Sequence, residues 1–252
     1  MGGMKIIDLS VPLENDKSWA PWWARNRVKY QDHRIGAKAI RLLFRVPSRL
    51  LPDGLGWAND TIKLSTHGTT HMDAPWHYAP ECDGQAAKTI DQIPLDWCFA
   101  DGVKLDLTGF DDGYAIQVED LERTGVEINP GNIVLLHTGN DRLRGTRDYF
   151  TRGAGVSAEA TRWLIEKGVK VMGIDGWGWD VPLPGQARLA REKDKTGVFW
   201  SAHFVGREQE YCQLERLTNL DQLPSNGFKI SCFPLKVKGG SAGPARVVAI
   251  FD

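Results

Sequence analysis

The sequence predicts a mixed α/β protein with a central β-sheet or barrel-like core flanked by helices. Short apolar, β-branched segments recur along its 252 residues, and segments with helical signals lie between some of them. No internal repeat, low-complexity tract or polar linker interrupts this series, so we expect a single domain over residues 1–252. Strands outnumber helices, and the loops between the elements are expected to carry the site.

The predicted strands share a length of five to ten residues and a high content of Val, Ile and Leu. They cover residues 5–9, 39–46, 61–65, 103–107, 132–137, 169–174, 228–237 and 245–251.

Two segments carry helical signals. Residues 157–168 begin with Ser157, a good N-cap, have Glu159 in the first turn and end at Gly168, a typical C-terminal glycine. Residues 118–124 predict a shorter helix after an extended stretch over 114–117. The segment 182–198 is long, polar and highly charged, and we expect a solvated surface excursion there. The functional alternative is a lid or a subunit contact.

The charge balance excludes two classes of partner. With 31 Lys and Arg against 32 Asp and Glu, the net charge is −1, and neither a basic stripe for nucleic acid nor a polybasic patch for a membrane surface occurs. The first residues lack the pattern of a secretion signal, and no apolar run has the length of a transmembrane helix. Four widely spaced cysteines are typical of reduced, mostly buried thiols, so a cytoplasmic protein is expected.

The segment from His67 to His77 is the most informative part of the chain. It holds three of the six histidines together with Asp73, the nitrogen and oxygen donors that bind divalent metals. Gly68 argues against a helix here, so we expect a strand that runs into an irregular loop, in which His71 and Asp73 point the same way and His67 comes round to join them. His77, four residues beyond Asp73, is the candidate acid or base beside the metal. A closed structural metal site is the main rival, although such sites favour cysteine.

This pattern, H-x3-H-x-D-x-P-x-H, resembles the signature of the cyclase-like family of metal-dependent hydrolases, which includes bacterial kynurenine formamidase and isatin hydrolase. A second element agrees, because His203 is followed twelve positions later by Glu215. Segments 7–13, 131–139, 173–175 and 234–249 also resemble family landmarks. The resemblance covers nearly the whole chain and implies a single domain of the swivelling β/β/α type.

The resemblance implies a role for each matching residue. His67, His71 and Asp73 would hold the primary metal, and His77 would be the catalytic acid or base. Asp73 could bridge to a second ion bound by His203 and Glu215; in family members with one ion, His203 and Glu215 shape the site instead. One or two ions per subunit, of Zn²⁺ or Mn²⁺, therefore remain open.

Two positions depart from the family pattern. Glycine follows the first histidine directly, as Gly68, where the family commonly has it one residue later, and Arg216 stands where the family usually has Asn. Neither change removes a ligand, but both reshape the pocket wall and weaken any transfer of substrate identity.

The expected activity is hydrolysis of a C–N amide bond in a small aromatic substrate, either an aryl formamide or a cyclic amide, by water that the metal activates. A lactone or cyclic-imide hydrolase with the same site, or a non-catalytic metal- or ligand-binding protein, is the alternative. Among ten tryptophans, Trp22 or Trp23, together with Trp76, is expected to contact the substrate. The resemblance also implies a homo-oligomer, a dimer or a tetramer.

Overall fold

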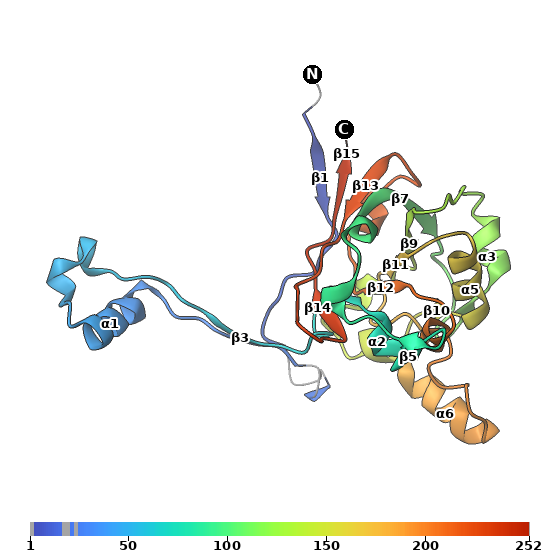
Figure 1. Ribbon diagram of the computed structural model, residues 1–252, viewed down its shortest axis with the longest axis horizontal. Helices are drawn as coiled ribbons and strands as arrows, with labels where there is room; N and C mark the ends of the chain where they lie inside the picture. The colour runs from blue at the N-terminus through green and yellow to red at the C-terminus, as the bar shows by residue number, and fades with distance from the viewer. Residues whose placement is uncertain (1–2, 17–20, 23–24, 252) are drawn as a thin grey trace. The chain divides into compact units, whose positions relative to one another are not determined.

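The central strands are apolar on both faces, which is the pattern of a buried parallel sheet. In the computed structural model, which describes residues 3–16, 21–22 and 25–251, β7, β9, β11 and β12 run parallel to one another. Antiparallel strands continue the sheet on both sides, so that nine strands of the described residues form one sheet (Figure 1). Their order is β1 (Lys5–Asp8), β15 (Val248–Phe251), β13 (Phe228–Ser231), β7 (Phe99–Asp106), β9 (Ile133–His137), β11 (Val171–Ile174), β12 (Cys212–Glu215), β4 (His71–Asp73) and β14 (Ala242–Pro244).

One face of the sheet packs against helices. Val134 and Leu136 of β9 are fully buried there with side chains from α3 (Val118–Arg123) and α5 (Ala158–Glu166) (Figure 1). The hydroxyl of Ser157 accepts the Ala160 N–H at 3.1 Å, and Gly168 takes the left-handed conformation, φ +86°, just after α5. The sequence signals at both ends of this helix therefore act as predicted.

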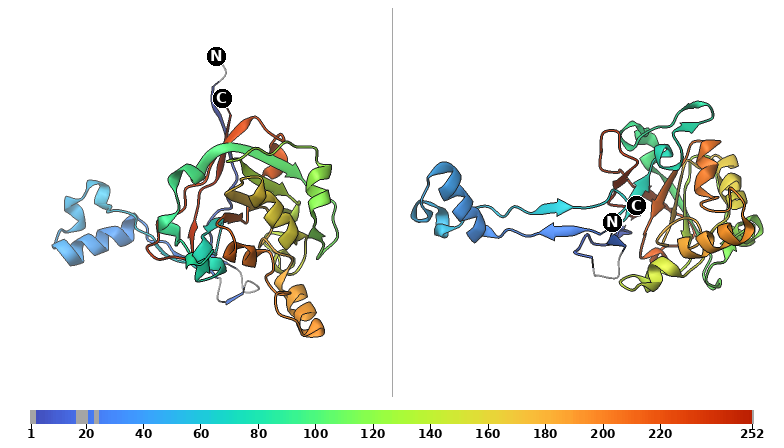
Figure 2. Two further views of the ribbon diagram at one scale, coloured as in Figure 1. Left: turned by 45° about the vertical axis from the view of Figure 1, so that its right-hand side comes forward. Right: turned by 90° about the horizontal axis from the view of Figure 1, so that it is seen from below.

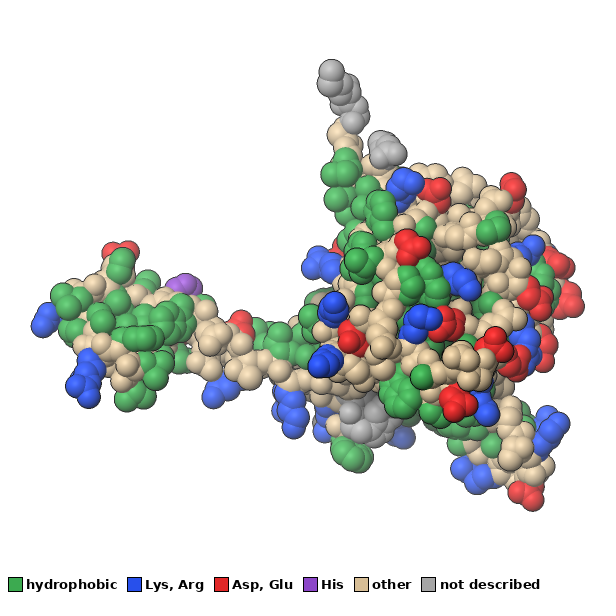
Figure 3. Space-filling view, in the orientation of Figure 1, with side chains coloured by type: hydrophobic (Ala, Val, Ile, Leu, Met, Phe, Trp, Pro, Cys, Tyr) green, Lys and Arg blue, Asp and Glu red, His purple; other side chains and the backbone are tan. Residues whose placement is uncertain are grey.

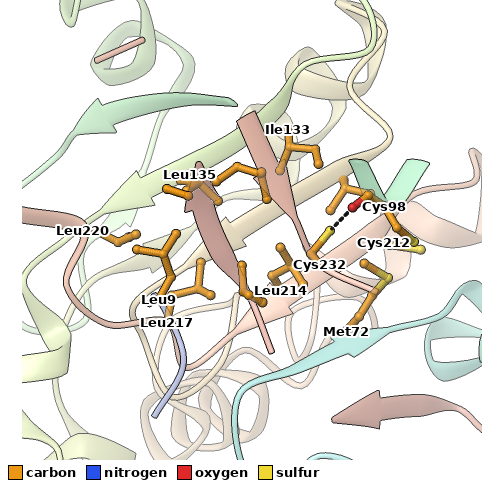
Figure 4. Packing of buried hydrophobic residues seen from close by; sticks show 14 of the residues in the cluster. Leu9, Met72, Cys98, Ile133, Leu135, Cys212, Leu214, Leu217, Leu220 and Cys232 are labelled. Atoms are coloured by element: carbon orange, nitrogen blue, oxygen red, sulfur yellow. Dashed lines mark hydrogen bonds between the residues drawn. The ribbon is translucent and has the colours of Figure 1, made fainter. Parts of the chain in front are cut away.

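The other face of the sheet is closed by the sheet itself. Ile133 and Leu135 alternate with Val134 and Leu136 along β9, so their side chains point to this second face. They pack among side chains of β1, β4, β12, β13 and β15, because the sheet curls round into a half-barrel (Figures 2 and 4). Cys232 lies in this core with its Sγ 3.4 Å from the Cys98 carbonyl oxygen. All four cysteines are free and buried.

We expect loss of core packing to destabilise this half-barrel strongly. Leu214 of β12 is fully buried, and Leu214→Ala should lower the free energy of unfolding by about 2–5 kcal/mol, since it removes apolar contacts and leaves a cavity. Leu95→Ala is the matched control, because Leu95 is 72% exposed and its truncation should change stability by roughly 0.5 kcal/mol or less. Urea denaturation of both variants measures the difference; equal midpoints would contradict the assignment of the core.

Smaller elements connect the strands. Those in the same unit as the sheet are α2 (Pro75–Tyr78), β5 (Glu81–Cys82), β6 (Gln85–Ala86), η4 (Ile90–Gln92), η5 (Leu95–Cys98), β8 (Ala115–Ile116), η6 (Asn140–Leu143), α4 (Asp148–Thr151), β10 (Gly155–Val156), α6 (Leu183–Lys193), η7 (His203–Arg207) and η8 (Leu220–Gln222). Across the described residues, no helix is long and apolar enough to cross a bilayer.

Residues 13–65 form a second compact unit, while residues 1–12 and 66–252 form the first. In this 13–65 unit, β2 (Arg27–Lys29) pairs antiparallel with β3 (Thr61–Lys63). Asp32 caps α1 (His33–Phe44) by accepting two backbone N–H groups, and η2 (Ser48–Leu50) and η3 (Pro52–Gly54) follow. Gly36 of α1 allows the helix to approach the chain closely, since a Cβ there would lie 1.8 Å from the Trp57 carbonyl oxygen. That the two units make one domain over 1–252 stays a prediction.

The predicted fold class, a mixed α/β protein with a barrel-like sheet and flanking helices, is confirmed. One of the predicted strands is wrong. Residues 39–46 lie mostly in α1, because the Asp32 cap begins a helix that their apolar content alone does not reveal. Residues 182–198 lie at the surface as predicted, with Gln186 as their one buried residue, but they contain the helix α6, which has Pro in its first turn and Arg191 and Lys193 in its last.

Candidate metal centre

Two neighbouring strands place polar side chains on one face of the half-barrel sheet. In β4, Met72 points into the hydrophobic core, so His71 and Asp73 on either side of it point to the opposite face. In β12, Leu214 points into the same core, and Glu215 therefore faces away from it. The predicted common direction of His71 and Asp73 is thus present, but it comes from a regular strand where an irregular loop was expected.

The register of the strand pair brings Glu215 to the histidines. β12 and β4 are antiparallel, and Glu215 is the direct partner of His71. Cross-strand partners have side chains within contact distance, and here Glu215 Oε2 lies 3.6 Å from His71 Nε2. The Trp179 N–H donates to Glu215 Oε1 at 2.8 Å, which fixes the carboxylate.

Hydrogen bonds orient two of the imidazoles. His71 Nδ1 donates to the Thr69 carbonyl oxygen at 2.6 Å, so the proton is on Nδ1 and the buried Nε2 presents a lone pair toward Asp73 and Glu215. His203 Nδ1 donates to Asp180 Oδ2 at 2.5 Å, and its Nε2 lies 3.5 Å from Glu215 Oε1. A histidine whose second nitrogen is tied to an acceptor is the usual arrangement of a metal ligand.

His67 and His77 complete the cluster from the loop before β4 and from α2. His67 Nδ1 lies 2.8 Å from Asp73 Oδ1, and His77 Nε2 lies 3.9 Å from Asp73 Oδ2. Their ring centroids are 4.0 Å apart. About one fifth of each side chain is exposed, whereas His71 and Asp73 are fully buried. His67 and His77 therefore form the side of the cluster that solvent and a substrate can reach.

The charges in the cluster favour the binding of a cation. Burial raises the pKa of Asp73, but the facing imidazoles of His77, His67 and His71 outweigh this and hold the pKa well below its usual range. Burial also lowers the pKa of His203, yet the hydrogen bond and the charge of Asp180 raise it to about 10. A buried carboxylate that stays ionised needs positive charge beside it, which a bound cation would supply.

The residues present fit a divalent metal. His71 Nε2 and both oxygens of Asp73 are buried. Among the described residues, His71 Nε2 and Asp73 Oδ2 have no hydrogen-bond partner, whereas Asp73 Oδ1 lies 2.8 Å from His67 Nδ1. Such orphaned atoms are costly unless something binds them. Two sets of donor atoms converge within 4.8 Å, and both include Asp73: His67, Asp73 and His77 make one set, and His71, Asp73 and Glu215 make the other.

The structure brings all six predicted metal and catalytic residues together, although their separate roles stay predictions. The tryptophans behave differently. Trp76 is on α2 directly before His77 and is 44% exposed, Trp22 belongs to the 13–65 unit and is 81% exposed, and Trp23 lies outside the described residues. Their contact with a substrate also stays a prediction.

Sequence reasoning missed the residues that support this cluster. Asp180 holds His203 from 23 positions away in the chain, and Trp179 holds Glu215 from 36 positions away. No spacing signal in the sequence reveals contacts at such separations. Trp200 stacks on His203 with centroids 4.5 Å apart. A cavity of about 940 Å³ lies beside α6, but its lining, which includes Arg162, Val198 and Phe204, contains none of the six cluster residues. That cavity is therefore not the space above the cluster.

Comparisons with known proteins find relatives over most of the chain. A family model described as "Putative cyclase" matches residues 7–181. The chain is 29% identical over 185 residues to a kynurenine formamidase of Erythrobacter litoralis, covering 73% of each protein. It is 25% identical over 243 residues to an isatin hydrolase of Roseibium aggregatum, covering 91% of this chain and 84% of that one.

Solved structures share the fold. Isatin hydrolase A from Labrenzia aggregata, bound to benzyl benzoate, superimposes with a TM-score of 0.73 at 24% identity, covering 98% of this chain and 94% of that one. A structure described as a potential metal-dependent hydrolase with cyclase activity gives a TM-score of 0.66 at 21% identity, with 99% of each chain covered.

Proposed function

The chain belongs to the cyclase family, and from that premise we propose that it is a metal-dependent hydrolase that cleaves a C–N amide bond in a small aromatic substrate. The observation that carries the proposal is the buried set of orphaned donor atoms on His71 and Asp73, facing His67, His77, His203 and Glu215. The relatives named kynurenine formamidase and isatin hydrolase support this class of reaction.

The donor set suits Zn²⁺ or Mn²⁺, because it combines imidazole nitrogens with carboxylate oxygens. We assign His67, His71 and Asp73 to a primary ion. His203 and Glu215 either bind a second ion that Asp73 shares or shape the site around one ion. When bound, a divalent ion lowers the pKa of a water molecule toward neutrality and polarises a carbonyl group.

His77 is assigned the proton transfers. Burial lowers the pKa of His77 to about 4, with the charge of Asp73 acting in the opposite direction, so its imidazole is neutral at neutral pH and can accept a proton. In the hydrolysis, water adds to the carbonyl carbon and the C–N bond breaks. His77 takes the proton of the water and returns it to the leaving nitrogen, so that an acid and an amine result.

A panel of substrates tests the proposal. N-formylkynurenine, isatin, a cyclic imide and an aryl lactone would be incubated with protein loaded with Zn²⁺ or with Mn²⁺, and with chelated protein as the control. We expect turnover of an amide with loaded protein and loss of that turnover on chelation. Turnover of the lactone or imide alone would place the same site in the alternative hydrolase class. Metal binding without any turnover would favour a non-catalytic protein.

We also propose that the chain is a homo-oligomer, and the 13–65 unit supports this. Its buried described residues are Asn26, Gly36 and Ala37, so no large apolar side chain among them is buried. Hydrophobic side chains instead gather on the surface around α1 (Figure 3). The large exposed ones are Trp22, Tyr30, Ile35, Leu42, Leu43, Phe44, Leu50, Leu55, Trp57 and Ile62. A two-stranded ribbon and a 12-residue helix are marginal in water without an apolar partner.

Charge indicates a second copy of the chain as that partner. The 13–65 unit has ten Lys and Arg against five Asp and Glu, a net charge of +5, and the rest of the chain, with 21 against 27, has −6. Like units would repel each other, so we infer that the 13–65 unit of one copy binds the acidic remainder of another.

Replacing apolar side chains of α1 should weaken this assembly. We expect the double variant Leu42→Ser and Leu43→Ser to shift the protein toward the monomer by at least about tenfold in dissociation constant, measured by light scattering over a dilution series. Leu95→Ser with Leu235→Ser is the control, since both residues are exposed outside the 13–65 unit. A monomeric wild-type protein would refute the proposal.

We propose a cytoplasmic location as well, on the basis of the four free, buried thiols.

A further inference from the structure

Trp200 has an unusual backbone conformation. Its φ is +65°, in the left-handed region that bulky side chains rarely occupy. Such a conformation persists only where the surrounding structure holds it, and it is often found at functional sites. The contacts on either side of Trp200 therefore show what holds this residue and what it holds in turn.

Helix α6 holds the backbone of Trp200 through one side chain. Gln186 Oε1 accepts the Trp200 N–H at 2.5 Å, and Gln186 Nε2 donates to the Val181 carbonyl oxygen at 2.5 Å. Gln186 is 3% exposed and is the sole buried residue of α6, all of whose residues are described. The amide therefore bridges two chain segments and anchors the charged helix between them.

A second bridge runs parallel to the first. Asp180 Oδ1 accepts the Ala202 N–H at 3.0 Å, and Asp180 Oδ2 accepts the His203 N–H at 3.1 Å as well as the His203 ring N–H. Together the two bridges fix residues 200–203 against residues 180–181. Trp200 and His203 are thus held by one hydrogen-bond network, to which α6 contributes the side chain of Gln186.

The indole ring of Trp200 lies against two rings of the metal centre. It stacks on His203 with centroids 4.5 Å apart and planes inclined by 21°, and it meets the ring of His77 edge-on, 4.9 Å away at 87°. His77 and His203 are 5.6 Å apart. The indole therefore restricts the orientation of both imidazoles, the one on its face and the other at its edge.

We propose that Trp200 is a positioning residue for His77 and His203, and that α6 keeps it in place through Gln186. This inference deepens the proposed hydrolase function and rests on it. The 940 Å³ cavity borders α6 at Leu189, so the helix has open space on that side where a core would otherwise pack against it. If the hydrogen bonds of Gln186 are lost, Trp200 consequently becomes more mobile, and the rings of His77 and His203 that it contacts become less well oriented.

Gln186→Met tests the inference, because it removes both hydrogen bonds at similar volume and touches neither histidine. Arg188→Met, an exposed position on the same helix, is the matched control. Ring ¹H–¹⁵N spectra of the full-length protein loaded with Zn²⁺ would be recorded, with His77 and His203 assigned from His→Gln variants. We expect Gln186→Met to move the ring resonances of both histidines and to lower kcat roughly 10- to 100-fold with KM and zinc content unchanged. Arg188→Met should change none of these.

A second pair of variants applies if Gln186→Met does not fold. Trp200→Phe keeps an aromatic ring against His77 and His203 and should retain more of kcat than Trp200→Leu. Unmoved His77 and His203 resonances in Gln186→Met, or equal kcat in Trp200→Phe and Trp200→Leu, would overturn the inference. If wild-type protein turns over no substrate, the proposed function fails, whereas the ring spectra still decide whether α6 positions the histidines.

Discussion

Asp73→Ala is expected to abolish both metal binding and activity. Asp73 belongs to both sets of converging donor atoms, and its buried Oδ2 has no hydrogen-bond partner among the described residues. Removing it takes away the carboxylate that any ion at this centre would contact. Metal analysis after dialysis should give less than about one tenth of the wild-type content, and turnover should fall by at least roughly 10,000-fold, because the activated water is lost with the metal.

A thermal shift separates loss of the site from loss of the fold. Added metal at about 100 times its dissociation constant should stabilise the wild-type protein by about 2.7 kcal/mol, since it binds the folded state. The melting temperature of Asp73→Ala should not respond to the metal. Asp96→Ala is the control, because Asp96 is an exposed carboxylate outside the cluster. Full metal content in Asp73→Ala would refute the metal centre itself.

His77→Ala is expected to lower kcat by about 100- to 10,000-fold while the metal stays bound, the range typical of a lost general acid or base. The partial exposure of His77, in contrast to the full burial of His71 and Asp73, places it on the side that a substrate can reach. Steady-state kinetics and metal analysis on the same preparation measure the two quantities. His33→Ala, an exposed histidine of the 13–65 unit, should change neither.

The geometry offers one rival to this assignment. His77 also belongs to a donor set with His67 and Asp73. If His77→Ala loses its metal together with its activity, His77 is a ligand, and the proton transfers then need another residue. Retention of metal with full activity would remove His77 from the chemistry altogether.

The sequence predicted the fold class and most central strands, because buried strands require continuous apolar segments. It also predicted the helix over 157–168 from its cap and terminal glycine, and both signals act as expected. It missed β4 and β12, the two strands that carry the site. Each is short and alternates between core residues and polar ones such as Glu215, so an apolar run does not mark it.

The sequence by itself predicted which side chains belong to the candidate centre: the spacing of His67, His71, Asp73 and His77 is local, and the family resemblance added His203 and Glu215. Only the tertiary structure decided how they meet. Pairing of β12 with β4 sets Glu215 opposite His71, and Asp180 and Trp200 orient His203. These contacts depend on strand register and on chain segments that folding brings together, and no local pattern encodes either.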